Sequence, residues 1–350
     1  MAFQINGNTI IDSSGSLIVN ANTSIANNFS VQLTPFASRE STSPMQGTVA
    51  GFTAGGNDGS SPPVETNVID KFPFANELTA VDHGDLQGPK RIHAGSSSDT
   101  QGFVAGGYFA PVSPVNLNTI DKFPFATNTT ASDHGDLGAD RRQLAGHSST
   151  TQGFVSGGIQ PATPRVNTVE KYNFASNVTA SDHGDLVVAT QDHAGQSSET
   201  HGYATGGLAP PTPTANPNTL NTITKFAFDT NTTASDVGDL TVLRTATTGD
   251  SSKSHGYTLS GYQNPPLVTL NVIDKFPFST DTNATDVGDT VDGVYFVSGQ
   301  NSREHGYISG GAGNSFYKTM IQRFPFAIDT NASDVGDLTQ ARGQNAGQQD

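Results

Sequence analysis

The chain alternates short runs of small and apolar residues with clusters of glycine, proline, asparagine and aspartate, and this alternation recurs at a nearly constant interval. The segment GFTAGG begins at Gly51, and equivalent segments begin at Gly102, Gly153, Gly202, Gly256 and Gly306. The intervals between them are 51, 51, 49, 54 and 50 residues. A repeat of this length indicates an architecture in which each unit buries its apolar faces against its neighbours.

Two further markers keep the same register within every copy. NVIDKFPF at residues 67–74 has a counterpart in each unit, and so has VDHGDL at residues 81–86. The first aspartate of the second marker is Asp82, Asp133, Asp182, Asp236, Asp286 or Asp334. Three markers in register in six copies predict six homologous units.

Each unit is expected to form four short strands, such as RRQLAGHSS, QGFVSGG, NTIDKFPF and TASDHGDL. Glycine pairs and Asn/Asp-Thr clusters between these segments favour turns, and the recurring Gly and Pro disfavour long helices. Short, evenly spaced strands favour a closed all-β array, so the predicted fold is a six-bladed β-propeller. Recurring phenylalanines such as Phe72, Phe123 and Phe276 are expected to fill the space between blades, where burying each side chain contributes roughly 1.5–3 kcal/mol.

Three features of the unit carry a family resemblance. Glycine pairs close the second strand at Gly55–Gly56, Gly106–Gly107, Gly157–Gly158, Gly206–Gly207 and Gly310–Gly311. Aromatic residues late in the third strand (Phe123, Tyr172, Phe226 and Phe276) and early basic residues (Arg91, Arg141, Arg244 and Arg342) complete the pattern. This pattern resembles the kelch repeat over residues from about 39 to 350, although the tryptophan of that repeat is absent and the fifth copy has Ser260–Gly261. The resemblance implies a kelch-like propeller fold and says nothing about function.

Two segments could supply the strand that closes the ring. Arg39 precedes Gly51 by the same 12 residues that separate Arg141 from Gly153, which favours residues 39–50 as the first strand of the first blade. The tail ARGQNAGQQD is the second candidate for the same place. The spacing of the first candidate is complete, so residues 39–350 are expected to form the propeller.

Residues 1–38 lie outside the repeat and are expected to form a short β-rich attachment segment. FQINGNTIIDSSGSLIVN alternates polar and apolar residues across Asn-Gly and Ser-Gly turns, which favours small hairpins. A piece of this size cannot build a core of its own. It resembles the opening segment of structural and tail-fibre proteins of tailed phages of marine bacteria, and this resemblance implies a virion protein tethered by its N-terminal segment.

Composition narrows the chemistry that the chain can perform. The 350 residues carry 17 Lys and Arg against 32 Asp and Glu, a formal net charge of −15. This balance disfavours nucleic acid and anionic membranes and suits a neutral, cationic or protein partner. The absence of cysteine excludes disulfides, zinc–thiolate sites and thiol nucleophiles. No apolar run approaches the ~20 residues that span a bilayer, so membrane insertion is not expected.

The acidic turns are the most obvious candidate sites, and turn chemistry is the simpler interpretation of them. The aspartate of each Asp-x-Gly-Asp segment can cap its own turn. Residues 329–334 place oxygen groups at alternate positions as a calcium loop does, but they lack the glycine and distal glutamate of an EF-hand. His93 and His193 fall on the predicted innermost strands, nearer the channel. We predict neither a bound metal nor a cofactor.

The segments after the glycine pairs vary most between units, and all of them are expected to emerge on one face of the ring. They are rich in proline, which stiffens a loop, and they carry aromatic rings suited to sugars or protein surfaces. The alternative is that these rings pack back onto the rim of the propeller. The candidate binding residues are Tyr108, Phe109, Tyr262, Phe316 and Tyr317.

Together these features predict a non-enzymatic virion structural protein, namely a tail-fibre, spike or decoration component of a phage particle. Its N-terminal segment would attach to other virion proteins, and one propeller face would meet a host-surface glycan, a receptor or a neighbouring subunit, with a homo-oligomer left open. The alternatives are a glycan-acting propeller enzyme and a cellular kelch-type interaction scaffold. An enzyme would need acidic, Arg or Tyr side chains converging at the channel mouth, whereas a binding protein would show aromatic residues on the loop-bearing face and no perturbed carboxylates.

Overall fold

The computed structural model describes residues 3–5, 8–11, 46–75, 79–110, 115–162, 164–211, 218–313 and 316–350. The chain divides into two units, Met1–Ser41 and Thr42–Asp350. In the first unit, β1 (Phe3–Ile5) pairs antiparallel with β2 (Asn8–Ile11). Arg39 and the predicted boundary between residues 38 and 39 lie outside the described residues, so that boundary stays a prediction.

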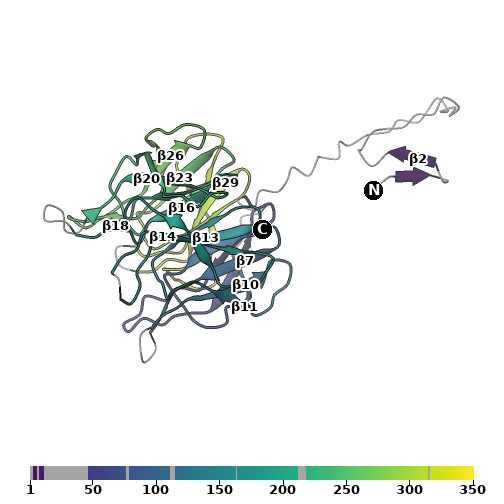
Figure 1. Cartoon of the computed structure of the whole chain (residues 1–350), viewed down its shortest axis with the longest axis horizontal. Coiled ribbons are helices and arrows are strands. Elements are labelled where there is room, and N and C mark those ends of the chain that lie inside the picture. The colour runs from purple at the N-terminus through teal and green to yellow at the C-terminus, as the bar shows by residue number, and fades with distance from the viewer. Residues whose placement is uncertain are drawn as a thin grey trace. The chain divides into compact units, whose positions relative to one another are not determined.

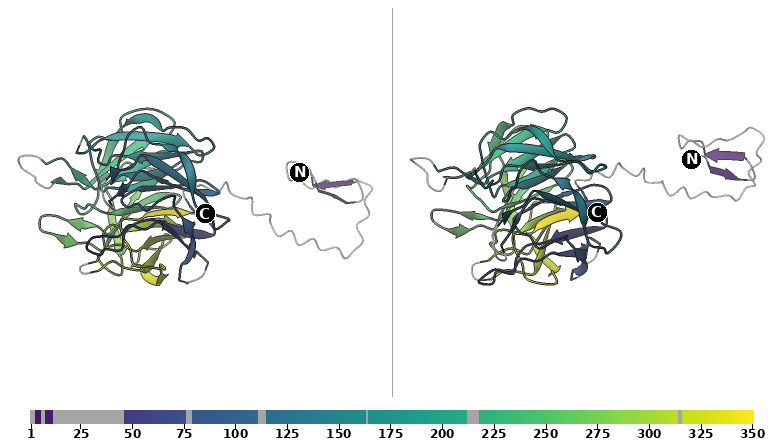
Figure 2. Two further views of the ribbon diagram at one scale, coloured as in Figure 1. Left: turned by 90° about the horizontal axis from the view of Figure 1, so that it is seen from below. Right: turned by 60° about the horizontal axis from the view of Figure 1, so that its bottom comes forward.

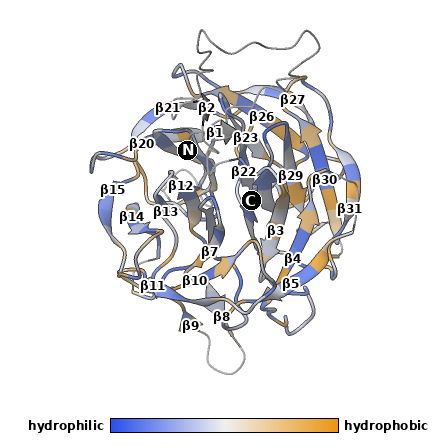
Figure 3. Ribbon diagram, turned by 90° about the vertical axis from the view of Figure 1, so that its right-hand side faces the viewer, coloured by the Kyte–Doolittle hydropathy of each residue, from blue (hydrophilic) through white to orange (hydrophobic). Residues whose placement is uncertain are grey.

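The described part of the second unit consists of six four-stranded antiparallel sheets around an axis and contains no helix (Figures 1 and 3). This confirms the expected six-bladed β-propeller. The burial of the strands explains the arrangement. The second strand of the first blade is buried at every residue, whereas the outermost strand is exposed at its first two residues. Blades therefore pack face to face, and polar residues lie at the outer edge.

Each blade runs from an innermost strand at the axis to an outermost strand at the rim. In this order the first blade contains β32 (Ala346–Gln349), β3 (Ala50–Ala54), β4 (Val68–Pro73) and β5 (Val81–Asp85), and the second contains β6 (Ala94–Ser97), β7 (Gln101–Ala105), β10 (Thr119–Pro124) and β11 (Ser132–Asp136). The third contains β12 (Ala145–Ser148), β13 (Gln152–Ser156), β14 (Thr168–Asn173) and β15 (Ser181–Asp185), and the fourth contains β16 (Ala194–Ser197), β17 (His201–Thr205), β20 (Thr222–Ala227) and β21 (Ser235–Asp239). The fifth contains β22 (Thr248–Ser251), β23 (His255–Leu259), β26 (Val272–Pro277) and β27 (Thr285–Asp289), and the sixth contains β28 (Ser298–Asn301), β29 (His305–Ser309), β30 (Met320–Pro325) and β31 (Ser333–Asp337). Short two-stranded ribbons pair β8 (Tyr108–Phe109) with β9 (Val115–Asn116), β18 (Leu208–Ala209) with β19 (Asn218–Thr219), and β24 (Tyr262–Gln263) with β25 (Val268–Thr269).

The C-terminal tail closes the ring, so the prediction that residues 39–50 would do so is wrong. β32 pairs with β3, and Gln349 lies opposite Gly51. The reason lies in the sequence of the innermost strand: RGQNAGQQ at residues 342–349 reproduces RRQLAGHS at residues 141–148, including the Ala-Gly pair. Residues 39–50 match only the spacing of the arginine and lack this pair.

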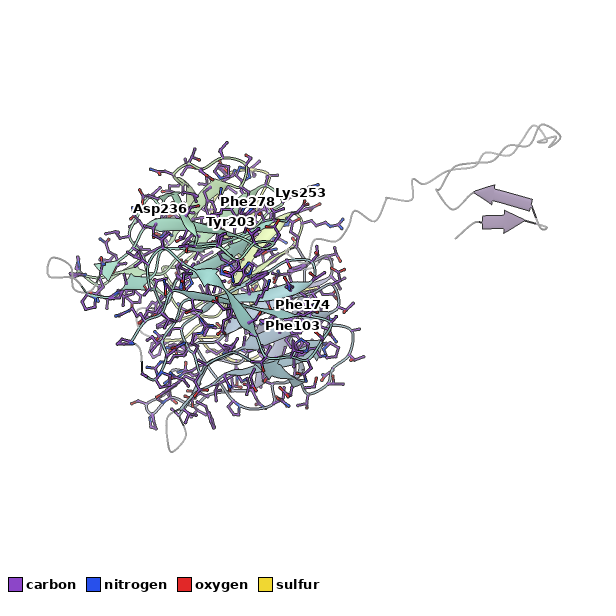
Figure 4. All side chains as sticks on the ribbon, viewed as in Figure 1. Phe103, Phe174, Tyr203, Asp236, Lys253 and Phe278 are labelled. Atoms are coloured by element: carbon purple, nitrogen blue, oxygen red, sulfur yellow. The ribbon has the colours of Figure 1, made fainter. Side chains whose placement is uncertain are left out.

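Aromatic side chains fill the gaps between adjacent blades. Phe52 of β3 stacks on Phe125 of the second blade with 4.7 Å between ring centroids, and Phe123 lies 5.7 Å away. Figure 4 labels two equivalent pairs, Phe103 with Phe174 and Tyr203 with Phe278. The core therefore lies between the blades, as the repeated phenylalanines predict. The remaining stacked pairs are Phe154–Phe228, Tyr257–Phe326 and Tyr307–Phe74.

Glycines let the innermost strands approach one another at the axis. The second residue of each innermost strand is a glycine, and a Cβ atom added to Gly146 would overlap the backbone carbonyl of Gly95 in the preceding blade. The same conflict with a neighbouring carbonyl recurs around the ring. A larger residue would push the blades apart, so these positions require glycine. The full set is Gly95, Gly146, Gly195, Gly249, Gly299 and Gly347.

Buried ion pairs join the segment before the innermost strand to the third strand. Arg244 contacts Asp274 at 2.7 Å, and both side chains are fully buried. Breaking such a pair typically costs about 3–5 kcal/mol, because one charge is left buried without its partner. In the second blade Lys90 makes this pair, so the assignment of Arg91 to the basic position is wrong by one residue. The equivalent pairs are Arg342–Asp70 at 2.8 Å, Arg141–Glu170 at 2.6 Å and Lys90–Asp121 at 3.1 Å.

Asp250 departs from the pattern of the residues that follow the axial glycines. Gln196 and Gln300 occupy the equivalent position, and each donates its side-chain amide to a backbone carbonyl of the next blade at 3.0 Å. The Asp250 carboxyl is buried, and neither of its oxygens makes a hydrogen bond of good geometry with the described residues. Burial raises the pKa of Asp250 well above its ordinary value, against a smaller opposite effect of the Tyr307 backbone.

We expect Asp250→Asn to raise the unfolding temperature at pH 7. The unfolded carboxyl ionises above pH about 4, whereas burial raises the pKa of the folded carboxyl. The folded state then binds more protons, so the wild type loses stability as the pH rises above 4. Asparagine removes this penalty, and the expected gain is about 1–3 kcal/mol. Thermal melts should show the gain at pH 7 and its disappearance near pH 4, whereas Asp140→Asn, at an exposed position, should change neither.

Candidate functional site

The two ends of the blades differ. In each blade the second strand runs toward the glycine pair, or toward Ser260–Gly261 in the fifth, and the variable loops follow there. We call this end the loop face. The chain enters the propeller at Gln46–Val49 and ends at Asp350 on the opposite end, the terminal face, where the Val49 amide donates to the Asp350 carbonyl over 2.7 Å. Figure 2 shows the β18–β19 and β24–β25 ribbons projecting from one side and the C-terminus on the other.

Exposed apolar side chains gather on the loop face. Of the thirteen large hydrophobic side chains exposed among the described residues, nine follow the second or the fourth strand of a blade and so lie at this end. The loop face is therefore the more apolar of the two ends among the described residues. The nine are Val64, Val115, Val187, Val188, Leu243, Leu267, Val268, Val291 and Phe316.

A closed ring of backbone hydrogen bonds surrounds the channel on the loop face. The residue two positions before each innermost strand adopts a left-handed conformation with φ between 51° and 59°. Each donates its N–H to the carbonyl of its counterpart in the preceding blade over 2.7–3.1 Å. Non-glycine residues in this conformation are uncommon and concentrate at functional sites. We call this set the mouth ring: Ile92, Gln143, Asp192, Ala246, Phe296 and Gln344.

The mouth ring lines a cavity of about 140 Å³. The cavity ends at the axial glycines, and a second cavity of about 70 Å³ lies beyond them toward the terminal face. The hydrogen-bonded order of the blades places Asp192 across the first cavity from Gln344, and Gln143 across it from Phe296. Polar and aromatic residues of the ring therefore stand on opposite sides of one cavity.

Asp192 is the charged member of the mouth ring. Its Oδ2 accepts hydrogen bonds from Nε2 of Gln143 at 2.6 Å and from Nε2 of Gln191 at 3.1 Å. Burial raises the pKa of Asp192 to about 6, against the opposite effects of these two amides and of Arg165 and Arg142. A carboxyl that titrates near neutrality in a cavity wall can accept hydrogen bonds from a ligand, and it has the acidity that proton transfer requires.

An arginine–tyrosine cluster adjoins the ring. Tyr108 lies between two guanidinium groups, with Cζ of Arg91 5.3 Å and Cζ of Arg142 4.7 Å from its ring centroid. Arg91 also pairs with Glu65 at 3.2 Å and donates to Oε1 of Gln344 at 3.2 Å. Cation–π contacts of this kind hold the tyrosine in a fixed orientation next to the mouth ring.

An aromatic sector occupies the other side of the mouth. Tyr262 packs edge-on against Tyr295 at 5.3 Å between ring centroids, and Tyr295 lies 5.4 Å from Phe296 of the mouth ring. The ring of Tyr317 lies against Gly343, and burial raises the pKa of its hydroxyl. Partly buried aromatic rings of this kind offer apolar faces to a ligand at small entropic cost.

The five residues predicted to bind lie on the loop face at different distances from the cavity. Tyr108, Tyr262 and Tyr317 are partly buried and surround the mouth ring through their contacts with Arg91, Tyr295 and Gly343. Phe109 is half-buried in β8, and Phe316 is 80% exposed. None of the five lines the cavity itself, and their role in binding stays a prediction.

Reasoning from the sequence missed the mouth ring. Its members stand two residues before the small-residue–glycine pair of each innermost strand, so aligning the repeats on that pair locates them. No residue type marks them, because the six side chains differ. Attention to the loops after the glycine pairs found the surrounding tyrosines and overlooked the residues that line the hollow.

The other candidate groups serve the architecture. The Asp-x-Gly-Asp segments are bulged outer strands, in which Oδ1 of Asp82 accepts from the Gly84 amide at 2.7 Å. Nε2 of His83 is 2.9 Å from a backbone carbonyl of the next blade, and Asp329 pairs with Lys275 at 2.8 Å. Among the residues that the structure describes, no three His, Asp or Glu side chains are placed to share a metal ion. Nor does that part of the chain contain a helix long and apolar enough to cross a membrane.

Comparisons with known proteins support the fold and give no information on activity. No family model matches the chain, and no curated protein matches it. Among solved structures, that of YjhT is similar with a TM-score of 0.61 and 14% sequence identity, over 75% of this chain and 88% of that one. At this identity the likeness supports the six-bladed propeller architecture and carries no activity across.

Proposed function

We propose that this chain is a non-enzymatic structural protein of a phage particle, a tail-fibre, spike or decoration component that binds through its loop face. The observation that carries the proposal is the separation of the two faces. Residues 46–49 and Asp350 lie on the terminal face, whereas the mouth ring and most exposed apolar side chains lie on the loop face. The loop face carries neither of these segments, so a partner can reach it.

The sequence supports the setting on a virion. The N-terminal segment resembles the opening of phage structural proteins, and the repeats resemble kelch units. The net charge of −15 suits a soluble, displayed domain. In this proposal the first segment contacts other virion proteins, and the loop face meets a host glycan, a receptor or a neighbouring copy.

Mass spectrometry of gradient-purified particles tests the proposal. We expect the full-length chain to copurify with particles and a chain lacking residues 1–41 to be lost from them, because that unit carries the attachment. Absence of the full-length chain would contradict the virion role. Equal retention of both chains would contradict the attachment role of the N-terminal segment alone.

Asp192 favours a second candidate, a glycan-acting enzyme. Its pKa of about 6, next to arginine and tyrosine side chains at the channel mouth, fits the pattern expected of such an enzyme. Incubating the protein with oligosaccharides and searching for products by mass spectrometry distinguishes the two. Turnover that Asp192→Asn abolishes would establish the enzyme, and unchanged oligosaccharides would favour the binding protein.

A further inference from the structure

We propose that the mouth ring binds the terminal sugar ring of a neutral hexose chain. Asp192, Gln143 and Gln344 hydrogen-bond its hydroxyl groups, and Phe296 with the flanking tyrosines packs against its apolar face. This inference deepens the proposed binding role of the loop face and rests on it.

The backbone shows that the side chains of the ring are retained against strain. Among the described residues, every other left-handed position except Ser260 is a glycine, including both glycines after the second strand in most blades. At the six positions of the mouth ring every residue carries a side chain, among them the bulky Ile92 and Phe296. Glycine would relieve the strain at each position. Side chains retained at strained positions are typical of functional sites.

The charges at the mouth favour a ligand without net charge. The ionisable member of the ring is Asp192, which would repel a carboxylate or phosphate. Arg91 is already paired with Glu65, and Arg142 donates to the amide oxygen of Asn116 at 3.1 Å. Arg142 and Arg165 also act on the Asp192 carboxyl and lower its pKa, which offsets its negative charge. These arginines in turn disfavour a cationic ligand. A ligand that carries hydroxyl groups and no net charge avoids both kinds of repulsion.

The polar groups suit vicinal hydroxyls. Gln143 uses Nε2 to hold Asp192 and keeps its Oε1 as an acceptor, while Gln344 uses Oε1 to hold Arg91 and keeps its Nε2 as a donor. Donors and acceptors fixed by neighbours recognise a ligand at small entropic cost. Phe296 stands opposite Gln143 in the mouth ring. Its aromatic ring can pack against the C–H face of a sugar.

The size of the cavity limits the size of its occupant. The cavity of about 140 Å³ is smaller than the ~300 Å³ typical of a drug-sized ligand. It therefore accommodates the end of a chain.

A glycan array carrying neutral hexose-terminated and acid-terminated chains, followed by calorimetry with the best free oligosaccharide, tests the inference on the full-length protein. We expect neutral termini to bind and acid-terminated ones to bind at least tenfold more weakly. Asp192→Gly and Gln344→Gly, on opposite sides of the cavity, should each weaken binding tenfold or more while unfolding at the same or a higher temperature. Asp192→Asn should stay within a few fold of the wild type.

Ser260→Gly is the matched control. Ser260 has φ 56° but stands in the position of a paired glycine outside the mouth ring, so its replacement should leave binding unchanged. Binding of acid-terminated chains alone, no glycan binding by the intact protein, or full binding by both glycine variants would each overturn the inference. A chain present in particles without neutral-glycan binding defeats this inference and spares the virion role. Neutral-glycan binding by a chain absent from particles would support this inference and contradict the virion role.

Discussion

Deleting Ala346–Asp350 is expected to abolish the cooperative unfolding transition of the propeller or to lower its midpoint by more than 10 °C. β32 forms the innermost strand of the first blade, Gly347 packs between Gly299 and Gly95 at the axis, and the Asp350 carbonyl accepts from the Val49 amide. Without it, β3 presents an open edge, and the sixth and second blades each lose their contact with the first blade at the axis. The loss is a large part of the ~5–15 kcal/mol that typically stabilises a domain. Differential scanning calorimetry and circular dichroism measure it.

Deleting residues 1–41 is the matched comparison. That unit clusters separately from the propeller, and the closing strand comes from the other terminus, so the unfolding temperature should change by no more than about 2 °C. A propeller that melts normally without residues 346–350 and fails without residues 1–41 would show that the N-terminal side closes the ring.

The sequence predicts the blades because their markers are local. The glycine pairs, the NVIDKFPF-type strand and the Asp-x-Gly-Asp segment each recur within about 50 residues, and burial of the intervening aromatics dictates face-to-face packing. The sequence also identifies the closing strand, because the Ala346-Gly347 pair matches the Ala-Gly pair of other innermost strands. The spacing between Arg39 and Gly51 gave the wrong closing strand. An innermost strand needs a glycine where it meets its neighbours at the axis, and an arginine at the right distance does not supply one.

The candidate site is harder to predict because it is assembled from all six blades. Asp192 and Gln344 lie 152 positions apart in the chain, and they face one another only once the ring is closed. All six mouth-ring residues share a left-handed backbone conformation. The sequence does not reveal this, because a positive φ is not expected of a residue other than glycine. Repeat alignment identifies what blades have in common, whereas this site consists of the side chains by which they differ.

Gly146→Ala is expected to destabilise the propeller by about 3 kcal/mol or more, at or beyond the upper end of what overpacking usually costs. The carbonyl of Gly95 occupies the place that the new methyl group needs, and both atoms belong to innermost strands fixed by their sheets. No side chain can rotate away, so the two blades must separate. The movement spreads around the ring, since every blade makes the same contact with the next.

Gly88→Ala tells this steric effect apart from the general cost of replacing a glycine. A Cβ atom at Gly88 meets nothing within 4 Å, and its backbone is not left-handed, so alanine should leave stability unchanged or raise it slightly by restricting the unfolded chain. Chemical denaturation of the two variants and the wild type measures the difference. Equal free energies of unfolding for Gly146→Ala and Gly88→Ala would mean that the blades do not meet at the axis as closely as the glycine ring requires. In that case the cavity above the ring would continue as an open channel, and a long chain could thread it where only a terminal sugar is now expected to fit.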